Sequence, residues 1–243
     1  MENIERIALS IARGICYNDK NNAWMQGHAA LGIQGGEEKA MTTQQRDERG
    51  DRCVLYTILP GRDPGKDLRA LCEMGANSIQ APLEMHPELA PLCREAGLEL
   101  KPAAGTTSAS RLADYEYALV ADIPVVIPFW EEGGCSLLQP DGEWGDLFYL
   151  CRAFWCREPF VRICRCAVQE GRGAVVKAYS NLPSMTLLVN GRVTEKRNAA
   201  HIFIFEDVPV RLIGRNILAV QNGECRDSMR IERSIEQVAP RSR

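Results

Sequence analysis

The stretch that decides the fold runs from Val175 to Ile231 and reads VVKAYSNLPSMTLLVNGRVTEKRNAAHIFIFEDVPVRLIGRNILAVQNGECRDSMRI. Short alternating apolar runs are separated by turn residues at intervals of roughly 8–12 residues, the rhythm of an all-β sandwich. Asn190-Gly191 and Asn222-Gly223 each lie between two such runs. Asn-Gly tolerates the positive φ angles of a type I′ hairpin turn. The pattern therefore predicts an antiparallel β-sandwich in the carboxyl half of the chain.

The amino half has a different texture. Strand-like apolar runs alternate with amphipathic helix patterns, which implies parallel strands joined by right-handed crossovers. A complete eight-fold β/α barrel needs at least about 200 residues, and only about 140 precede the sandwich. We therefore predict an α/β domain at 1–143, a partial or truncated β/α barrel or a small open layer, and a sandwich domain at 144–243. The expected elements, in order, are 53–59, 67–74, 77–80, 86–95, 98–103, 110–120 and 123–130.

The composition of the chain argues against several classes of function. The chain has 243 residues, 45% hydrophobic and 25% charged, with a net charge of −3. Such a balance predicts no nucleic-acid partner and no affinity for membrane surfaces. Residues 2–13 read as an amphipathic helix without the long apolar core of a secretory signal. A cytoplasmic location is the expectation, and oligomerisation is left open.

The chain has ten cysteines and three histidines, residue types that serve as metal ligands and nucleophiles. Without a secretory signal, free thiols are favoured over a disulfide framework. Cys164 and Cys166 lack the paired spacing of a structural zinc site. His86 heads a predicted helix and has no serine or cysteine partner at a recognised spacing. No metal and no cofactor are therefore predicted.

Two matching segments resemble a known family. FYLCRAFWCREPFVRIC (148–164) followed by VVKAYSNLPSMTLLVNGR (175–192) is similar to the region just after the barrel in glycoside hydrolase family 2, the β-galactosidase and β-glucuronidase group. The resemblance implies that the sandwich is immunoglobulin-like and follows a sugar-cleaving barrel. The matching residues are Phe148, Tyr149, Trp155, Pro159, Lys177, Tyr179, Ser180, Asn181, Leu187, Val189, Asn190 and Gly191.

A second match lies upstream, in the same order as in the family. DLRALCEMGANSIQ (67–80) and ELAPLCREAGLEL (88–100) are similar to the first strand-helix unit of that barrel. Two departures matter for chemistry. Gln80 stands where the family has an arginine at the strand end, and the chain contains no Asn-Glu dipeptide of the acid/base type.

Retaining glycosidases need two carboxyl groups about 5–5.5 Å apart. Glu131 and Glu132 follow the apolar run 123–130 and are candidates for the nucleophile, and Glu84 is a candidate acid. A solvated acidic turn is the competing interpretation for the adjacent pair. The candidate substrate-binding residues are Asn77, Gln80 and Trp130. The aromatic cluster Phe148, Tyr149, Phe154, Trp155 and Phe160 is expected to serve packing rather than sugar binding.

The sequence is compatible with three hypotheses. The first is a glycoside hydrolase-like protein acting on β-linked sugars in the manner of β-galactosidase, with a carbohydrate partner. The second is a non-catalytic accessory module that binds a carbohydrate or a protein. The third is an unrelated α/β layer of the sugar-isomerase kind, which usually needs a metal with histidine ligands. Histidine is scarce, with only three in the chain, and this weakens the last hypothesis.

Overall fold

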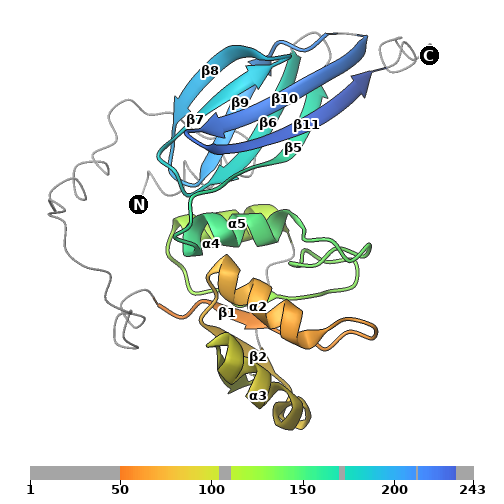
Figure 1. Ribbon diagram of the computed structural model, residues 1–243, viewed down its shortest axis with the longest axis vertical. Coiled ribbons are helices and arrows are strands. Elements are labelled where there is room, and N and C mark those ends of the chain that lie inside the picture. Colours follow the sequence, from red (N-terminus) through yellow and green to blue (C-terminus); the bar gives the residue numbers. More distant parts are fainter. Residues whose placement is uncertain (1–49, 104–110, 170–172, 212, 234–243) are drawn as a thin grey trace, which may run out of the picture. The chain divides into compact units, whose positions relative to one another are not determined.

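The computed structural model describes residues 50–103, 111–169, 173–211 and 213–233 (Figure 1). The predicted helix over residues 2–13 lies outside the described residues. The chain divides into two units after Asp51, and the described residues from Arg52 onward belong to the second unit. None of the helices in the described part of the chain has the length and apolar character needed to cross a membrane.

The second unit begins with an α/β layer in which strands and helices alternate, as the sequence predicts. Its elements are β1 Cys53–Leu55, α2 Pro64–Met74, β2 Ser78–Ala81, the 3₁₀-helix η3 Leu83–Met85, α3 His86–Ala96, β3 Glu99–Pro102, α4 Leu112–Val120, β4 Ile127–Pro128 and α5 Asp146–Trp155. The four strands form one sheet with the order β3-β2-β1-β4. The pairs β1–β2, β2–β3 and β1–β4 are all parallel.

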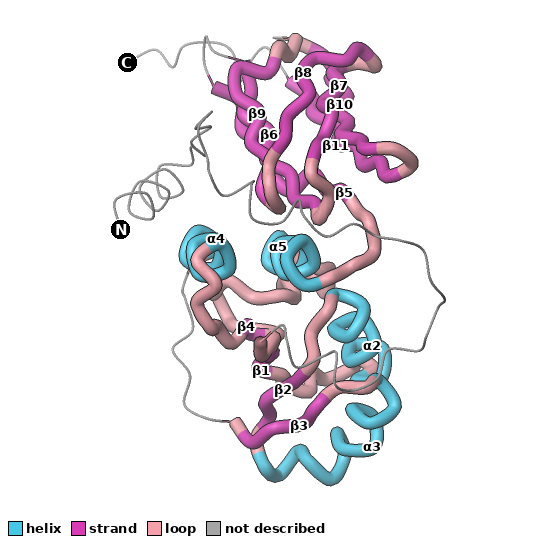
Figure 2. Tube along the Cα trace, turned by 90° about the vertical axis from the view of Figure 1, so that its left-hand side faces the viewer, coloured by secondary structure: helices cyan, strands magenta, loops and turns pink. Residues whose placement is uncertain are grey.

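The helices follow the order of the strands. α3 contacts α2, α2 contacts α5, and α5 contacts α4, so the row α3-α2-α5-α4 runs alongside the strand row β3-β2-β1-β4. Figure 2 shows these four helices as an arc along one side of the sheet. Val54, Ile79 and Ile127 are in register across the sheet and fully buried. On the alternate face of the sheet, Leu55 is in register with Gln80 and both are partly exposed.

Helix α2 begins and ends where local chemistry dictates. The Asp63 carboxylate accepts hydrogen bonds from the backbone N–H groups of Gly65 at 2.9 Å and Lys66 at 3.3 Å. Pro64 follows at the first helical position, where its missing N–H is not needed. This cap explains why the helix starts earlier than the predicted 67–74. Gly75 ends it with a φ of 108°, as its position in the sequence predicts.

Gly75 also permits a close approach between the ends of two helices. A Cβ at this position would lie 2.6 Å from the carbonyl carbon and oxygen of Trp155, at the end of α5. The same carbonyl accepts a hydrogen bond from Arg52 Nη1 at 3.3 Å. Gly75 belongs to the upstream family match and Trp155 to the downstream one. The two matching segments are therefore in contact.

The strand predicted at 123–130 is much shorter in the structure, where only Ile127 and Pro128 are in the sheet. Pro124 and Pro128 have no N–H to donate to a neighbouring strand, which limits regular pairing. Beyond the strand, the N–H groups of Leu137 and Leu138 donate to the carbonyls of Pro128 at 3.0 Å and Phe129 at 2.9 Å. The chain thus folds back and covers the outer edge of β4.

The all-β prediction for 175–231 is confirmed in the described part of that segment, which forms two packed antiparallel sheets. One sheet has the order β11-β10-β7-β8 and the other β5-β6-β9. Val176, Phe203 and Phe205 from one sheet pack with Leu187 and Leu218 from the other in the core, and all five are fully buried. The strands are β5 Val161–Gln169, β6 Gly173–Ser180, β7 Ser184–Val189, β8 Arg192–Asn198, β9 Ile202–Val208, β10 Gly214–Asn222 and β11 Cys225–Arg233.

The two Asn-Gly turns differ. Asn190 and Gly191 join β7 to β8 with φ angles of 51° and 80°, which fits the predicted type I′ turn. The prediction for Asn222-Gly223 is wrong by one residue. Asn222 pairs with Cys225, so the turn residues are Gly223 and Glu224, and only Gly223 has a positive φ, 57°. Asn222 stays in the strand, where its side-chain Nδ2 donates to the Ser184 carbonyl at 2.5 Å.

Candidate functional site at the carboxyl edge of the parallel sheet

Parallel strands bring their carboxyl ends to one edge, the usual place for a binding site in α/β proteins. Here the edge is formed by the residues that follow β2, β1 and β4. The N–H of Tyr56 donates to the Gln80 carbonyl at 2.8 Å, and the N–H of Phe129 donates to the Leu55 carbonyl at 2.9 Å. These bonds extend the strand pairing by one residue beyond β1 and β4, and they fix the positions of the residues that follow. Gln80, Glu84, Trp130, Glu131 and Glu132 all lie at or beyond this edge.

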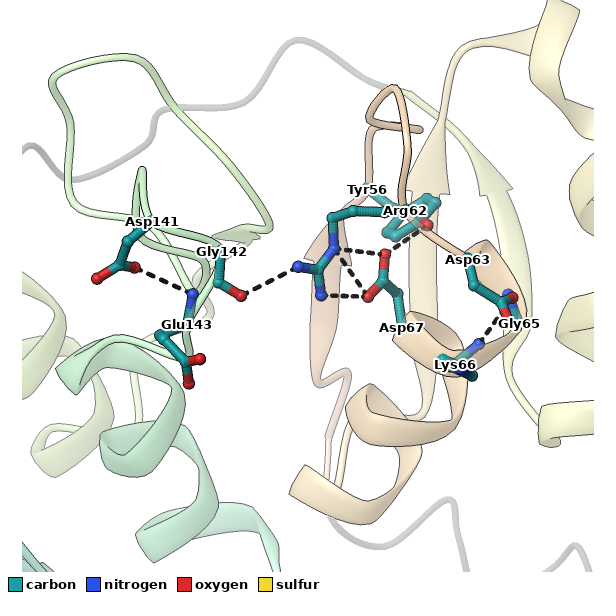
Figure 3. A network of polar contacts seen from close by, with 9 residues as sticks. All are labelled: Tyr56, Arg62, Asp63, Gly65, Lys66, Asp67, Asp141, Gly142 and Glu143. Atoms are coloured by element: carbon teal, nitrogen blue, oxygen red, sulfur yellow. Dashed lines mark hydrogen bonds and ion pairs between the residues drawn. The ribbon is translucent and has the colours of Figure 1, made fainter.

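An ion pair with a buried carboxylate and a partly exposed arginine lies beside the end of β1 (Figure 3). Asp67, only 2% exposed, accepts from Arg62 Nη2 at 2.6 Å and Nε at 3.1 Å, and the Tyr56 hydroxyl lies 3.4 Å from its second oxygen. Arg62 Nη1 donates to the Gly142 carbonyl at 3.0 Å. The network therefore ties the β1–α2 loop to the turn that precedes α5.

The electrostatics of this network favour a positioning role for Tyr56 and Arg62 over proton transfer. Burial, followed by the charge of Asp67, raises the pKa of Tyr56 well above its ordinary value, so its hydroxyl stays protonated as a donor. The hydrogen bond to Asp67 raises the pKa of Arg62, so this side chain stays charged. Neither group can exchange a proton near neutral pH. Their contribution to a site is to position the surrounding loops.

Aromatic rings pack next to this network. Tyr56 and Phe129 have ring centroids 4.7 Å apart, and Phe129 meets Trp144 edge-on at 6.2 Å. Trp144 stacks on Phe148 at 4.4 Å. Phe148 is 6% exposed. The expectation that Phe148 serves packing rather than sugar binding is confirmed.

The turn after β4 carries the predicted nucleophile candidates. Glu131 and Glu132 are both exposed. The Glu131 carboxylate folds back over Gly134, where an added Cβ would displace it, and the Gly134 N–H donates to the Glu131 carbonyl at 3.3 Å. Within the described residues Glu132 makes no hydrogen bond or ion pair. Trp130 beside them is 37% exposed, so part of its ring faces solvent.

Glu84, the predicted acid, is exposed in η3, directly after β2. His86 follows it, and its Nε2 lies 3.0 Å from the Ala81 carbonyl at the end of the strand. The carbonyl can only accept, so Nε2 carries the proton. A general acid usually needs burial or a neighbouring charge to raise its pKa. The catalytic roles of Glu84, Glu131 and Glu132 stay predictions.

Asn77 is separated from the other candidates. It precedes β2 and therefore lies at the amino edge of the sheet. Its side-chain oxygen accepts from the Arg52 N–H at 2.9 Å, and its carbonyl accepts from the Glu99 N–H at 3.0 Å. These bonds link the entries of β1, β2 and β3. The structure thus gives Asn77 a supporting position, while its predicted substrate contact stays untested.

Gln80 remains at the carboxyl edge, on the sheet face away from the helices. It lies in register between Leu55 and Lys101. Its side-chain oxygen is shielded from solvent and has no hydrogen-bond partner in the described part of the chain. A buried acceptor without a donor is costly. Gln80 is therefore a predicted binding residue whose side-chain acceptor no donor satisfies in the described part of the chain.

A second polar cluster, which the sequence did not reveal, joins α4 to strand β6. Glu116, 1% exposed, accepts a hydrogen bond from the Tyr179 hydroxyl and forms an ion pair with Lys177 Nζ. Burial raises the pKa of Asp146, at the start of α5, and the nearby Lys177 opposes this. Lys177 and Tyr179 belong to the segment that resembles the family, and this resemblance is the only sequence feature that points to them. Glu116 could not be predicted, because nothing in its local sequence marks it as buried.

Two further residues of the match also connect segments. The Ser180 hydroxyl donates to the Phe160 carbonyl at 2.7 Å. Asn181 accepts from the Phe160 N–H at 3.1 Å and donates to the Cys156 and Glu158 carbonyls at 3.1 and 2.7 Å. The Tyr-Ser-Asn segment therefore pins the chain between α5 and β5. In the described residues no group of three or more histidine, cysteine or acidic side chains is placed to hold a metal ion.

Comparisons with known proteins give a loose likeness. No family model matches the chain, and no curated protein does. Among solved structures, an FMN-binding β-glucuronidase from Facaelibacterium prausnitzii L2-6 matches with 19% identity and a TM-score of 0.44, over 77% of this chain and 35% of that one. A putative β-galactosidase from Bacteroides fragilis matches with 17% identity and a TM-score of 0.38, over 65% of this chain and 32% of that one. The chain spans about a third of the length of these enzymes.

Proposed function

We propose that this chain is a glycoside hydrolase-like protein, similar to family 2, that takes β-linked sugars at the carboxyl edge of its parallel sheet. The observation that carries the proposal is the order of strands and helices. In a closed eight-fold barrel the last strand lies beside the first, and all helices lie outside. The strand row β3-β2-β1-β4 and the helix row α3-α2-α5-α4 have the order expected if the middle strands of such a barrel were left out, and this order supports the proposal.

The part after the sheet supports the same descent. Helix α5 is followed by seven strands in sheets of four and three, an arrangement typical of immunoglobulin-like sandwiches. The residues that resemble the family form contacts between these parts of the chain. Gly75 lies against Trp155, and Lys177 and Tyr179 both contact Glu116.

The proposed site combines a platform, an acceptor and acids. The half-exposed ring of Trp130 can take the apolar face of a sugar, and Gln80 offers an unused acceptor to a hydroxyl. Glu132 or Glu131 would act as the nucleophile and Glu84 as the acid, because retaining hydrolysis requires two carboxyl groups. The Arg62–Asp67 pair would hold the neighbouring loops in place.

The test is hydrolysis of 4-nitrophenyl β-galactoside and β-glucuronide by the full chain. We expect release of nitrophenol that is reduced at least about a hundredfold in Glu132→Gln and Glu84→Gln, the usual order for loss of an acid or base. Glu73→Gln, an exposed glutamate on α2, is the matched control and should retain activity. Turnover that survives both site variants would show that the chemistry lies elsewhere.

A second candidate function, a non-catalytic carbohydrate-binding module, is favoured by one observation. Glu84, Glu131 and Glu132 are all exposed, so none has the burial that tunes an acid. Calorimetry separates the two candidates. Saturable binding of an aryl β-glycoside, without nitrophenol release and weakened by Trp130→Ala, would support the module.

A further inference from the structure

The sandwich carries a groove beside the turn that joins β7 to β8. Its volume is about 540 Å³, within the roughly 300–1,000 Å³ of small-molecule sites. One wall is the turn and the start of β8, and the other is the segment between β9 and β10. The lining side chains that matter below are Asn190, Arg192, Val193, Thr194, Pro209 and Arg211.

One fully buried side chain holds the two walls together. Asn216 Oδ1 accepts from the Arg211 N–H at 2.8 Å, and Asn216 Nδ2 donates to the Arg211 carbonyl at 3.2 Å. The same Oδ1 accepts from Asn190 Nδ2 at 3.2 Å. Asn190 Oδ1 in turn accepts from the Ile217 N–H at 2.9 Å. The groove is thus preformed, so a ligand does not have to order its walls.

The charge of the groove is positive. Arg192 and Arg211 are exposed, and neither forms an ion pair with an acidic side chain in the described residues. The lining given by the described part of the chain contains no aspartate or glutamate. Arg197, further along β8, shows the contrast, because its Nη2 lies 2.6 Å from Glu195 Oε1. Two unpaired guanidinium groups at one groove favour a planar anion such as a carboxylate, which arginine binds with two hydrogen bonds.

Apolar surface lies beside this charge. Val193 is 68% exposed, and Pro209 is also exposed. The Thr194 hydroxyl donates to the Arg192 carbonyl at 3.3 Å, which keeps the start of β8 in place. The Thr194 oxygen can still accept, and Asn190 Nδ2 has a second proton to donate, so both can serve ligand hydroxyl groups. A ligand that suits such a groove therefore has an apolar flank, hydroxyl groups and a carboxylate. We propose that the groove binds an acidic sugar, with its carboxylate on Arg192 and Arg211 and the C–H face of its ring on Val193 and Pro209.

The experiment is isothermal titration calorimetry on the full chain with D-glucuronate, D-glucose and acetate as separate probes. These free sugars have no glycosidic bond to cleave, so the result is independent of the proposed hydrolysis at the sheet edge. We expect glucuronate to bind at least about tenfold more tightly than glucose and than acetate. Arg192→Gln and Arg211→Gln should each weaken glucuronate binding about tenfold, as expected for loss of one charge-assisted contact.

Arg215→Gln is the matched control, because Arg215 is an exposed arginine on β10 outside the lining. It should leave the affinity for glucuronate unchanged. Circular dichroism of all three variants would show that they remain folded. Equal binding of glucose, acetate as tight as glucuronate, or unchanged affinity in both groove variants would each overturn the proposal. So would a Kd for glucuronate weaker than about 10 mM.

Discussion

Replacing Gly75 by alanine should be one of the most damaging single-methyl changes in this chain. Two costs add. Gly75 has a φ of 108°, outside the region that L-residues favour, and forcing an alanine into a left-handed conformation costs about 1–2 kcal/mol. The new methyl would also lie 2.6 Å from the carbonyl carbon and oxygen of Trp155 and 2.8 Å from its Cβ. Overpacking of this kind costs typically about 1–3 kcal/mol.

The sum is about 2–5 kcal/mol, a large share of the roughly 5–15 kcal/mol that stabilises a typical domain. Urea unfolding followed by circular dichroism would report it as a lower midpoint at an unchanged m-value. Gly61→Ala is the matched control, because Gly61 has a φ of 79° and its Cβ would meet no atom within 4 Å. That variant should show only the conformational cost. If the two variants lose the same stability, the close approach of α2 to the end of α5 is refuted.

Three further predictions concern buried polar groups. Tyr179→Phe leaves the buried Glu116 without its hydroxyl donor and should cost about 1.5–3 kcal/mol in urea unfolding; a loss under 0.5 kcal/mol would contradict this contact. Arg62→Met strands the Asp67 carboxylate, and about 3 kcal/mol should be lost, most of it recovered in the double variant with Asp67→Leu. Burial lowers the pKa of His201 from its ordinary 6.5, so its stabilising effect is full above pH 6.5 and is lost as the pH falls through the folded pKa. His201→Asn, which tolerates the φ of 68°, should flatten this acid-side decline of the melting temperature, and an unchanged slope would refute the assignment.

Local chemistry made several features predictable. The helix ends at Gly75 and Gly97 and the turn at Asn190-Gly191 follow from glycine and asparagine conformations, and all three have positive φ. The sandwich was equally predictable, because alternation with period two determines which side chains enter a core. Helix starts were less predictable, since the Asp63 cap lies outside the apolar pattern of α2.

Features that depend on distant partners were not predictable from local patterns. Nothing in the sequence indicates that β4 pairs with β1 rather than with β3. Glu116 is buried because Lys177 and Tyr179 come from a strand some sixty residues away. Asn77 and Gln80 were both predicted to bind substrate, but Asn77 precedes β2 whereas Gln80 lies near the end of that strand, so the two lie toward opposite edges of the sheet.

Helix α5 has a consequence for how the chain could be divided. Leu147, Leu150 and Cys151 are fully or almost fully buried, and the helix contacts α2 and α4 as well as β5 and β6. A protease cut or gene fusion between residues 143 and 144 would leave α5 in the carboxyl fragment. The amino fragment would then lack a helix that packs against both α2 and α4. Recombination at this position would therefore expose apolar surface on both fragments. A sandwich exchanged between proteins would have to carry this helix with it.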